Sequence, residues 1–378
     1  MTLNYDYIII GGGLAGLQLA FELGNDRFFE QKTFAVIDPS LKNENDKTWC
    51  FWEQGDGKWD EIIQKSWQRG LFISSEKNIE LQLPPYSYKM LRSLDFYNFV
   101  KARLKNCSNI SFIQDEIETI DEASCIAYGK SNSYSALHIF DSRLSPSYLN
   151  DTTYSTIFQH FKGWTIKTKD PFFDPETFTM MDYTLKYKGS TSFTYVLPFS
   201  KTEALVEYTF FTPFLTEEAI YDKQLKTYLE DVLNLKDYTI TETEKGIIPM
   251  TDYPFHKDST SKITKIGTAG SWVKGSSGYS FKHTEKKVSQ IISNIKRGLD
   301  PGAELTSKKF RWFDSIFLDV LFRNNEMGED IFTKLYSKNS PQQIFKFLDE
   351  ETTLSEDLKV MLSLYHPQFI KSFFRKTF

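Results

Sequence analysis

The segment YIIIGGGLAG (Tyr7–Gly16) joins a continuous apolar run directly to a glycine-rich turn. A short run of this kind is typical of a parallel strand that is buried on both faces. The glycines fit the pattern G-x-G-x-x-G, and Leu17–Leu23 predicts the helix that should follow them. Phe34–Ile37 then predicts a second strand, which ends at Asp38. The region therefore predicts a complete β-α-β unit of the dinucleotide-binding type.

Five residues of the glycine-rich turn have distinct physical roles in the predicted nucleotide site. Gly11 permits the tight turn, Gly13 lets the backbone approach a pyrophosphate, and Gly16 lets the helix pack closely on the strand. Leu14 and Ala15 open the helix, where free N–H groups and partial positive charge attract phosphates. We therefore expect all five residues to contact the cofactor.

The position and number of such motifs favour FAD over NAD. Asp38 lies 22 positions beyond Gly16 and can accept hydrogen bonds from the adenosine ribose hydroxyls. The glycine motif begins within the first dozen residues, the usual place for it in FAD-containing proteins. No second G-x-G-x-x-G follows a strand of its own. One tightly held dinucleotide, FAD, is the better interpretation.

Composition excludes several classes of protein. The chain has 378 residues, a formal charge of −5, 25% charged residues and 40% hydrophobic residues, which is ordinary for a globular protein of two or three domains. The mild acidity argues against a nucleic-acid partner. Three cysteines without a C-x-x-C motif and five histidines without ligand spacing predict neither a disulfide framework nor a metal site.

Aromatic residues make up 16% of the chain, including 33 Phe, which suits either a Phe-rich core or a pocket for a large apolar ligand. No apolar stretch is long enough to span a bilayer, so we expect a cytoplasmic protein, free or peripherally attached to the inner membrane. The basic and aromatic tail Phe369–Phe378 suits a membrane surface, with a packed terminus as the alternative. The acidic run Asp349–Glu351 is expected to lie on a solvated face.

The middle of the chain has a different pattern. Residues 158–214 alternate apolar and polar side chains, as antiparallel strands do. Within Ala204–Phe211, strand alternation places Leu205, Glu207 and Thr209 on one face. Glu207 is a lone carboxylate among apolar neighbours. It belongs either to a solvated strand face or to a functional site.

Two later segments are predicted to return to the nucleotide domain. Ala136–Phe140 predicts a buried strand that ends in Asp141 at the carboxyl edge of the sheet, facing the cofactor crevice. Ile263–Gly270 predicts a further strand. It precedes the loop Gly275–Gly278 and a helix over Tyr279–Lys296, whose N-terminus suits the flavin ring or its phosphate arm.

Taken together, these motifs resemble the flavin-dependent bacterial lycopene cyclases over most of the chain. The segments that carry the resemblance are Trp49–Glu53, Met90–Ser93, Phe140–Arg143, Gln159–Trp164, Phe173–Pro175, Met181–Tyr183, Tyr195–Pro198, Leu205–Thr209, Ile248–Asp252, Gly267–Gly270 and Gly275–Phe281.

The resemblance implies an isomerase of the intramolecular lyase type. Such enzymes use reduced FAD, maintained by NAD(P)H, to convert lycopene into γ-carotene and then β-carotene without net redox change. It implies lycopene and other acyclic-ended carotenoids as substrates and a membrane surface as a partner. Glu207 matches the family's catalytic acid or base, and Asp182 is a second candidate. The implied cofactor contacts beyond the first turn are Arg92, Asp141, Gly267, Thr268, Ala269, Gly270 and Gly278.

The chemistry explains why a buried carboxyl group is needed. Protonation of a trisubstituted alkene creates a tertiary carbocation, so the site requires a strong acid and no nucleophilic water. A carboxyl group among Phe, Tyr and Leu is desolvated, so its pKa rises and it stays protonated. Aromatic faces then stabilise the cation by about 0.5–2 kcal/mol each.

The predicted architecture is α/β, with a Rossmann-like FAD-binding domain of the glutathione-reductase/hydroxylase type, an antiparallel-sheet substrate domain and C-terminal helices. The FAD-binding domain comprises residues 1–50, 85–155 and 262–300, the substrate domain 51–84 and 156–261, and the helical region 301–378.

Two alternative functions remain. One is a redox flavoenzyme, a hydroxylase or prenyl-chain reductase that acts on an apolar substrate. The other is a non-catalytic carrier, which the β-α-β unit disfavours.

Overall fold

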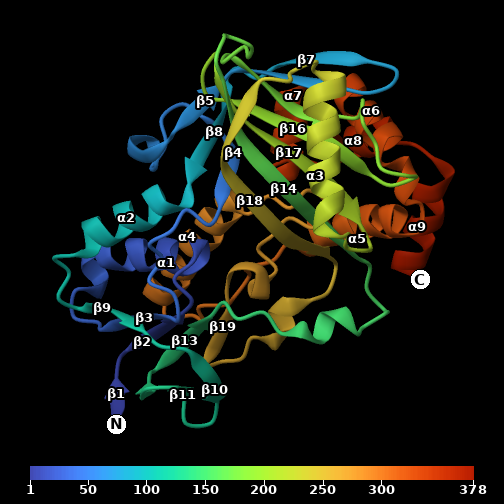
Figure 1. The fold of residues 1–378 in the computed structure, drawn as a ribbon. Coiled ribbons are helices and arrows are strands. Elements are labelled where there is room, and N and C mark those ends of the chain that lie inside the picture. Colours follow the sequence, from blue (N-terminus) through green and yellow to red (C-terminus); the bar gives the residue numbers. More distant parts are fainter.

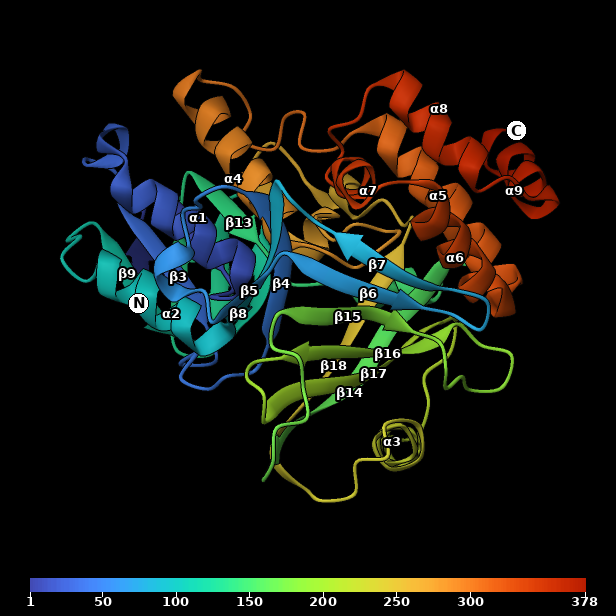
Figure 2. The ribbon, with the colours of Figure 1, turned by 90° about the horizontal axis from the view of Figure 1, so that it is seen from above.

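The computed structural model describes residues 1–378 and contains two large sheets (Figures 1 and 2). The first sheet has five parallel strands in the order β19-β13-β2-β3-β9. Its strands are apolar on both faces because both faces are covered. Their bounds are β2 (Tyr7–Ile10), β3 (Phe34–Asp38), β9 (Ile110–Gln114), β13 (His138–Asp141) and β19 (Ile263–Lys265).

Different layers cover the two faces of this parallel sheet. Ile9 and Val36 face the helical layer, whereas Ile8 and Ile37 face a small four-stranded sheet. The predicted β-α-β unit is confirmed, and its helix is longer than expected. The helical layer is α1 (Leu14–Asn25), α2 (Ser93–Leu104) and α4 (Phe281–Lys296); the small sheet is β1 (Thr2–Asn4), β10 (Ile117–Asp121), β11 (Ile126–Gly129) and β12 (Ser133–Ser135).

The second large sheet has seven strands in the order β18-β14-β17-β16-β15-β6-β7. Every neighbouring pair is antiparallel except β15 with β6. The antiparallel prediction for residues 158–214 is therefore confirmed. The strands are β6 (Arg69–Ile73), β7 (Asn78–Gln82), β14 (Thr156–Thr168), β15 (Thr177–Asp182), β16 (Ser192–Pro198), β17 (Glu203–Thr212) and β18 (Tyr238–Thr251).

Helices also cover both faces of the second sheet (Figure 2). Val206 and Tyr208 pack against α3 (Glu218–Thr227), whereas Leu205 and Phe211 face the C-terminal helices. A three-stranded sheet, β4 (Thr48–Gln54), β8 (Tyr86–Arg92) and β5 (Lys65–Trp67), lies between the two large sheets. The C-terminal helices are α5 (Lys308–Arg323), α6 (Gly328–Lys338), α7 (Pro341–Leu348), α8 (Leu354–Ser363) and α9 (Pro367–Thr377).

The expectation of a solvated face at Asp349–Glu351 is wrong for two of its three residues. The chain turns back toward α4 after α7, which buries Asp349 beside Trp52, whose indole Nε1 donates to it at 2.7 Å. Glu350 pairs with the buried Lys274 at 3.1 Å. Burial of a charge requires a partner, and these two carboxylates have one each.

No helix of the structure is both long enough and apolar enough to cross a bilayer. All three cysteines are free thiols.

Candidate functional site

A cavity of about 690 Å³ runs from the glycine-rich turn, past the seven-stranded sheet, to the C-terminal helices. Gly13–Gly16 line it at one end. Glu207 and Glu244 line its middle, and Tyr336 and Leu364 line it at the C-terminal helices. The cavity therefore connects the predicted nucleotide site with the predicted catalytic residue.

The glycine-rich turn has the geometry that each glycine predicts. Gly11 has φ +103°, a conformation that L side chains rarely adopt, and a Cβ there would overlap the Ser142 hydroxyl. A Cβ at Gly16 would overlap the Gly11 carbonyl oxygen. A Cβ at Gly13 would meet nothing within 4 Å, because it would project into open space. The backbone at Gly13 is therefore accessible to a ligand.

Two helix N-termini open onto the same cavity. Neither Gly13 at the start of α1 nor Ser280 at the start of α4 provides a side-chain cap, and neither helix has an acidic residue in its first turn. The hydroxyls of Ser276 and Ser277 and the Trp272 indole nitrogen are buried there without a partner. Free helix N-termini offer hydrogen-bond donors to a pyrophosphate, so these residues fit a dinucleotide.

Only some of the predicted cofactor contacts in the segment 267–278 line the cavity. Gly267 (φ +62°), Thr268 and Gly278 (φ +76°) line it. Ala269 and Gly270 are buried behind the wall, and a Cβ at Gly270 would overlap the Lys265 carbonyl oxygen. Leu14 and Ala15, predicted with the first turn, do line the cavity.

The three charged residues predicted to bind the cofactor do not line the cavity. Asp38 lies at the end of β3, where its Oδ2 accepts a hydrogen bond of 2.7 Å from the Gly12 N–H and so supports the turn. Arg92 is ion-paired with Glu242. A role for either in cofactor binding stays a prediction.

Asp141 is fully buried, but it keeps its charge. Burial acts to raise its pKa, but Arg143 at 2.9 Å and Lys265 at 2.8 Å hold the pKa below its usual range. Its side chain ties the carboxyl end of β13 to β19. We interpret this arrangement as a support for the crevice wall.

Glu207 points into the cavity from β17, on the face shared with Leu205 and Thr209, as the alternation predicts. The residue is only 7% exposed, and the Thr209 hydroxyl donates to its Oε1 at 2.8 Å. No cation pairs with it. Burial, together with the neighbouring Glu244, raises its pKa from 4.5 to about 8, so the carboxyl group is protonated at neutral pH.

Glu244 is a site residue that sequence reasoning missed. It lies on β18 and lines the cavity, and the Thr48 hydroxyl donates to it at 2.6 Å. Burial raises its pKa as well. Alternation within Tyr238–Thr251 could have placed Glu242 and Glu244 on one face. Nothing in the local sequence indicates that this face meets Glu207.

Asp182 is buried but does not line the cavity. It ends β15, where its Oδ2 accepts from the Tyr228 hydroxyl and its Oδ1 from the Thr184 N–H, both at 2.8 Å. Tyr228 belongs to the α3 side of the sheet. Both carboxylate oxygens therefore have structural partners on the face opposite Glu207.

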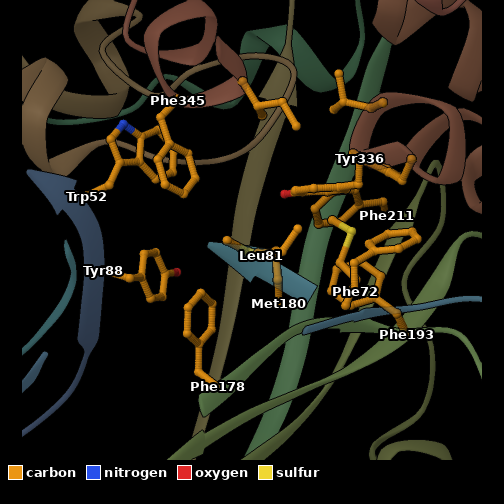
Figure 3. Close-up of a cluster of buried hydrophobic side chains, with 14 of the residues drawn as sticks. Trp52, Phe72, Leu81, Tyr88, Phe178, Met180, Phe193, Phe211, Tyr336 and Phe345 are labelled. Atoms are coloured by element: carbon orange, nitrogen blue, oxygen red, sulfur yellow. The ribbon is translucent and has the colours of Figure 1, made fainter. Parts of the chain in front are cut away.

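Aromatic side chains line the apolar part of the cavity, and those of Tyr88, Phe193, Phe211 and Tyr336 belong to the buried cluster in Figure 3. Tyr88 and Tyr336 direct their hydroxyl ends into the space from opposite sides. The Tyr88 hydroxyl forms hydrogen bonds of 2.8 Å with both Tyr195 and Tyr279. Because these hydroxyl groups satisfy one another, the polar atoms need no water inside an otherwise apolar chamber.

The sequence matches the family described as "Lycopene cyclase protein" over residues 6–375, nearly the whole chain. No curated protein matches it. Solved structures share this fold at 10–12% identity. A geranylgeranyl bacteriochlorophyll reductase-like protein from Thermoplasma acidophilum has a TM-score of 0.64, 12% identity and 98% coverage of both chains. The flavin-dependent brominase Bmp2 has a TM-score of 0.62 and 12% identity, and the match covers 95% of this chain and 93% of Bmp2.

A flavoprotein/dehydrogenase from Cytophaga hutchinsonii has a TM-score of 0.64 with 10% identity and covers 95% of this chain and 99% of its own. The fold class predicted from the sequence, α/β with a Rossmann-like domain, an antiparallel sheet and C-terminal helices, is confirmed. Through the match over residues 6–375, the chain belongs to the lycopene cyclase family.

Proposed function

We propose that this protein is a lycopene β-cyclase that binds FAD and converts lycopene to γ-carotene and β-carotene. The observation that carries the proposal is Glu207, a protonated carboxyl group without a cationic partner in an aromatic chamber that opens onto the glycine-rich turn. Flavin-dependent proteins among the structural neighbours support FAD as the cofactor. NAD(P)H is proposed as the reductant.

The residues of the chain supply an acid, a dry chamber and cation stabilisation. Glu207 donates its proton to the terminal alkene, and the resulting cation closes the ring by attack of the neighbouring double bond. Apolar walls exclude water that would trap the cation as an alcohol. The side chains of Tyr88, Tyr195 and Tyr279 line the chamber, where aromatic groups stabilise positive charge. Loss of a ring proton then completes an isomerisation with no net redox change.

The cofactor would be held by Gly13–Gly16 and the α1 N-terminus, together with Gly267, Thr268 and Gly278. A reduced, anionic flavin supplies negative charge that stabilises a nearby cation electrostatically.

We propose peripheral attachment to the inner membrane from the cytoplasmic side. In the tail, Arg375 is ion-paired with Asp319 and Lys376 with Asp252, so these charges are not free for lipid. The outer face of α8 is the better candidate. Its Leu354, Leu358, Leu362 and the following Tyr365 are 58–71% exposed. Leu364 beside them lines the cavity, so a bilayer there would lie next to the substrate's entry.

The test of catalysis uses purified protein, reduced FAD and lycopene in liposomes under anaerobic conditions, with NAD(P)H consumption followed alongside the carotenoid products. A β-ring product without stoichiometric NAD(P)H loss supports the cyclase. Product that tracks NAD(P)H one for one contradicts it and favours a reductase or hydroxylase.

The test of membrane attachment is vesicle flotation. Leu358→Ser with Leu362→Ser should reduce binding, whereas Leu137→Ser, an equally exposed leucine far from α8 in the chain, should not. Equal binding of both variants would exclude the α8 face.

A further inference from the structure

Three neighbouring strands bring two glutamates together above a glycine. Gly163 of β14 pairs with Glu207 of β17 on one side and with Glu244 of β18 on the other. Residues opposite one another on adjacent strands point to the same face of a sheet. Because Gly163 has no side chain, the two glutamates approach one another in the space above it, where a Cβ would lie 3.6 Å from Glu207 Cβ.

The glycine is needed for this contact. A Cβ at Gly163 would lie 3.2 Å from Glu244 Cγ and 2.9 Å from Leu205 Cδ1, so any larger residue would push into the space that the pair occupies. Two neighbouring carboxylates repel each other, and this repulsion favours a proton on one of them. The geometry therefore favours a single proton on the pair.

Each acid also has one hydroxyl donor of its own, Thr209 for Glu207 and Thr48 for Glu244. Glu242, two residues along β18, is bound to Arg92 and Asn45 and is about a third exposed. The acids thus form a row from the chamber toward the surface. The outer acid is paired with a cation, whereas the inner two have hydroxyl donors but no ion-pair partner.

We propose that Glu207 and Glu244 act as one unit that holds a single proton, delivers it to the substrate from Glu207 and takes a proton back when the ring is complete. This inference rests on the proposed cyclisation. In this pair, Glu244 holds Glu207 in position and returns a proton to it.

The steps balance without any co-reactant. The pair begins with one proton and a charge of −1. Donation forms a C–H bond at the alkene, which leaves two carboxylates and a carbocation. Ring closure converts one double bond into a C–C bond. Loss of a ring proton forms the new double bond from the C–H electrons and returns one proton to the pair. The repulsion within the doubly charged pair makes it a strong base at this moment.

The other groups around the pair do not change charge near neutral pH. Burial raises the pKa of the Cys50 thiol to about 12. Burial also raises the pKa values of Tyr88, Tyr195 and Tyr279 well above the usual value for tyrosine. The titratable and charged groups facing the pair from the surrounding elements are Cys50, Tyr88, Arg92, Tyr195, Glu242 and Tyr279.

The first test measures the proton without any substrate. Infrared titration of the purified protein should show a protonated carboxyl band that disappears at alkaline pH and is missing in Glu207→Gln. In Glu244→Gln the band should remain but disappear at a lower pH, because the like charge that favours protonation is gone. The same titration midpoint in Glu244→Gln and wild type would overturn the shared proton, whatever reaction the protein catalyses.

The second test measures turnover against pH. In Glu244→Gln the alkaline limb of kcat should move to lower pH. At any fixed pH above the limb, kcat should then fall about tenfold for each pH unit by which the limb moves. Glu203→Gln, on the same strand but outside the cavity, should leave the limb in place. A wild type that makes no β-ring product would reject the cyclase itself. A cyclase whose pH profile is unaffected by Glu244→Gln would reject only the pair.

Gly163→Ala provides a variant that keeps both acids. The added methyl group should separate them and move the alkaline limb in the same direction as Glu244→Gln does. If the limb stays in place in Gly163→Ala while the protein folds and binds FAD, the contact above the glycine is not required.

Discussion

The two large sheets each bury a carboxyl group, but one of these groups stays ionised and the other is protonated. Asp141, at the edge of the parallel sheet, has two cations within 3 Å and remains charged. Glu207, on the antiparallel sheet, has only hydroxyl groups and another acid around it and is protonated. The same burial therefore yields a structural ion pair in one sheet and a protonated carboxyl group in the other, and the neighbouring groups decide which.

The largest expected effect is on catalysis by Glu207→Gln. Glutamine keeps the size and the Thr209 contact but cannot donate an acidic proton, so cyclisation should fall by about 10²–10⁴-fold. The measurement is β-ring formation with reduced FAD, compared with Asp182→Asn, whose carboxylate faces the α3 side. Near-normal turnover in Glu207→Gln would contradict its role as the acid.

Asp141→Asn should affect stability rather than chemistry. It leaves Arg143 and Lys265 without their counter-charge and should lower the free energy of unfolding by about 3 kcal/mol. Urea denaturation of the flavin-free protein measures this loss. If Asp141→Asn instead unfolded like wild type but failed to bind FAD, Asp141 would be a cofactor ligand after all.

Two glycines of the nucleotide turn separate folding from binding. Gly16→Ala should clash with the Gly11 carbonyl and cost about 1–3 kcal/mol of stability. Gly13→Ala should fold normally, since its methyl group meets only open space. It should weaken FAD binding, because the proposed cofactor would occupy that space. Thermal unfolding without flavin and fluorescence titration with FAD distinguish the two. Equal FAD affinity in Gly13→Ala and wild type would move the pyrophosphate elsewhere.

The smallest effect is the pH dependence of stability, which should have opposite signs at the two carboxyl groups. Glu207 is ionised in the unfolded chain above pH 4.5 but protonated in the folded one up to about pH 8, so it costs stability as the pH rises through this window. Asp141 has a lowered pKa, so its contribution is present above pH 3.8 and is lost as the pH falls.

Holding Glu207 protonated costs roughly 3 kcal/mol at pH 7, and burial of the glutamine amide offsets part of the gain, so Glu207→Gln should be more stable than wild type there by about 1–2 kcal/mol. This advantage should vanish near pH 4. Denaturant midpoints at several pH values provide the comparison. A variant that is less stable than wild type at pH 7 would show that the carboxyl group is not held protonated.

Sequence reasoning worked where the evidence was local. The β-α-β unit could be predicted because its strand, turn and helix are contiguous, and each glycine's role follows from its place in the turn. The face of Glu207 followed from the alternation within one strand. The faces of Asp182 and Glu244 did not, because each depends on which strands lie beside it.

The sequence by itself determined the parallel nucleotide fold, the antiparallel middle, the candidate Glu207 and the membership of a family. Only the tertiary structure decided that Glu244 meets Glu207 above Gly163 and that Asp182 lies on the opposite face of the sheet. It also decided that Asp141 is paired with two cations and stays ionised. The physical reason is that protonation depends on the local dielectric and on neighbouring charges. Strand register brings those neighbours together from distant parts of the chain, and no local pattern encodes it.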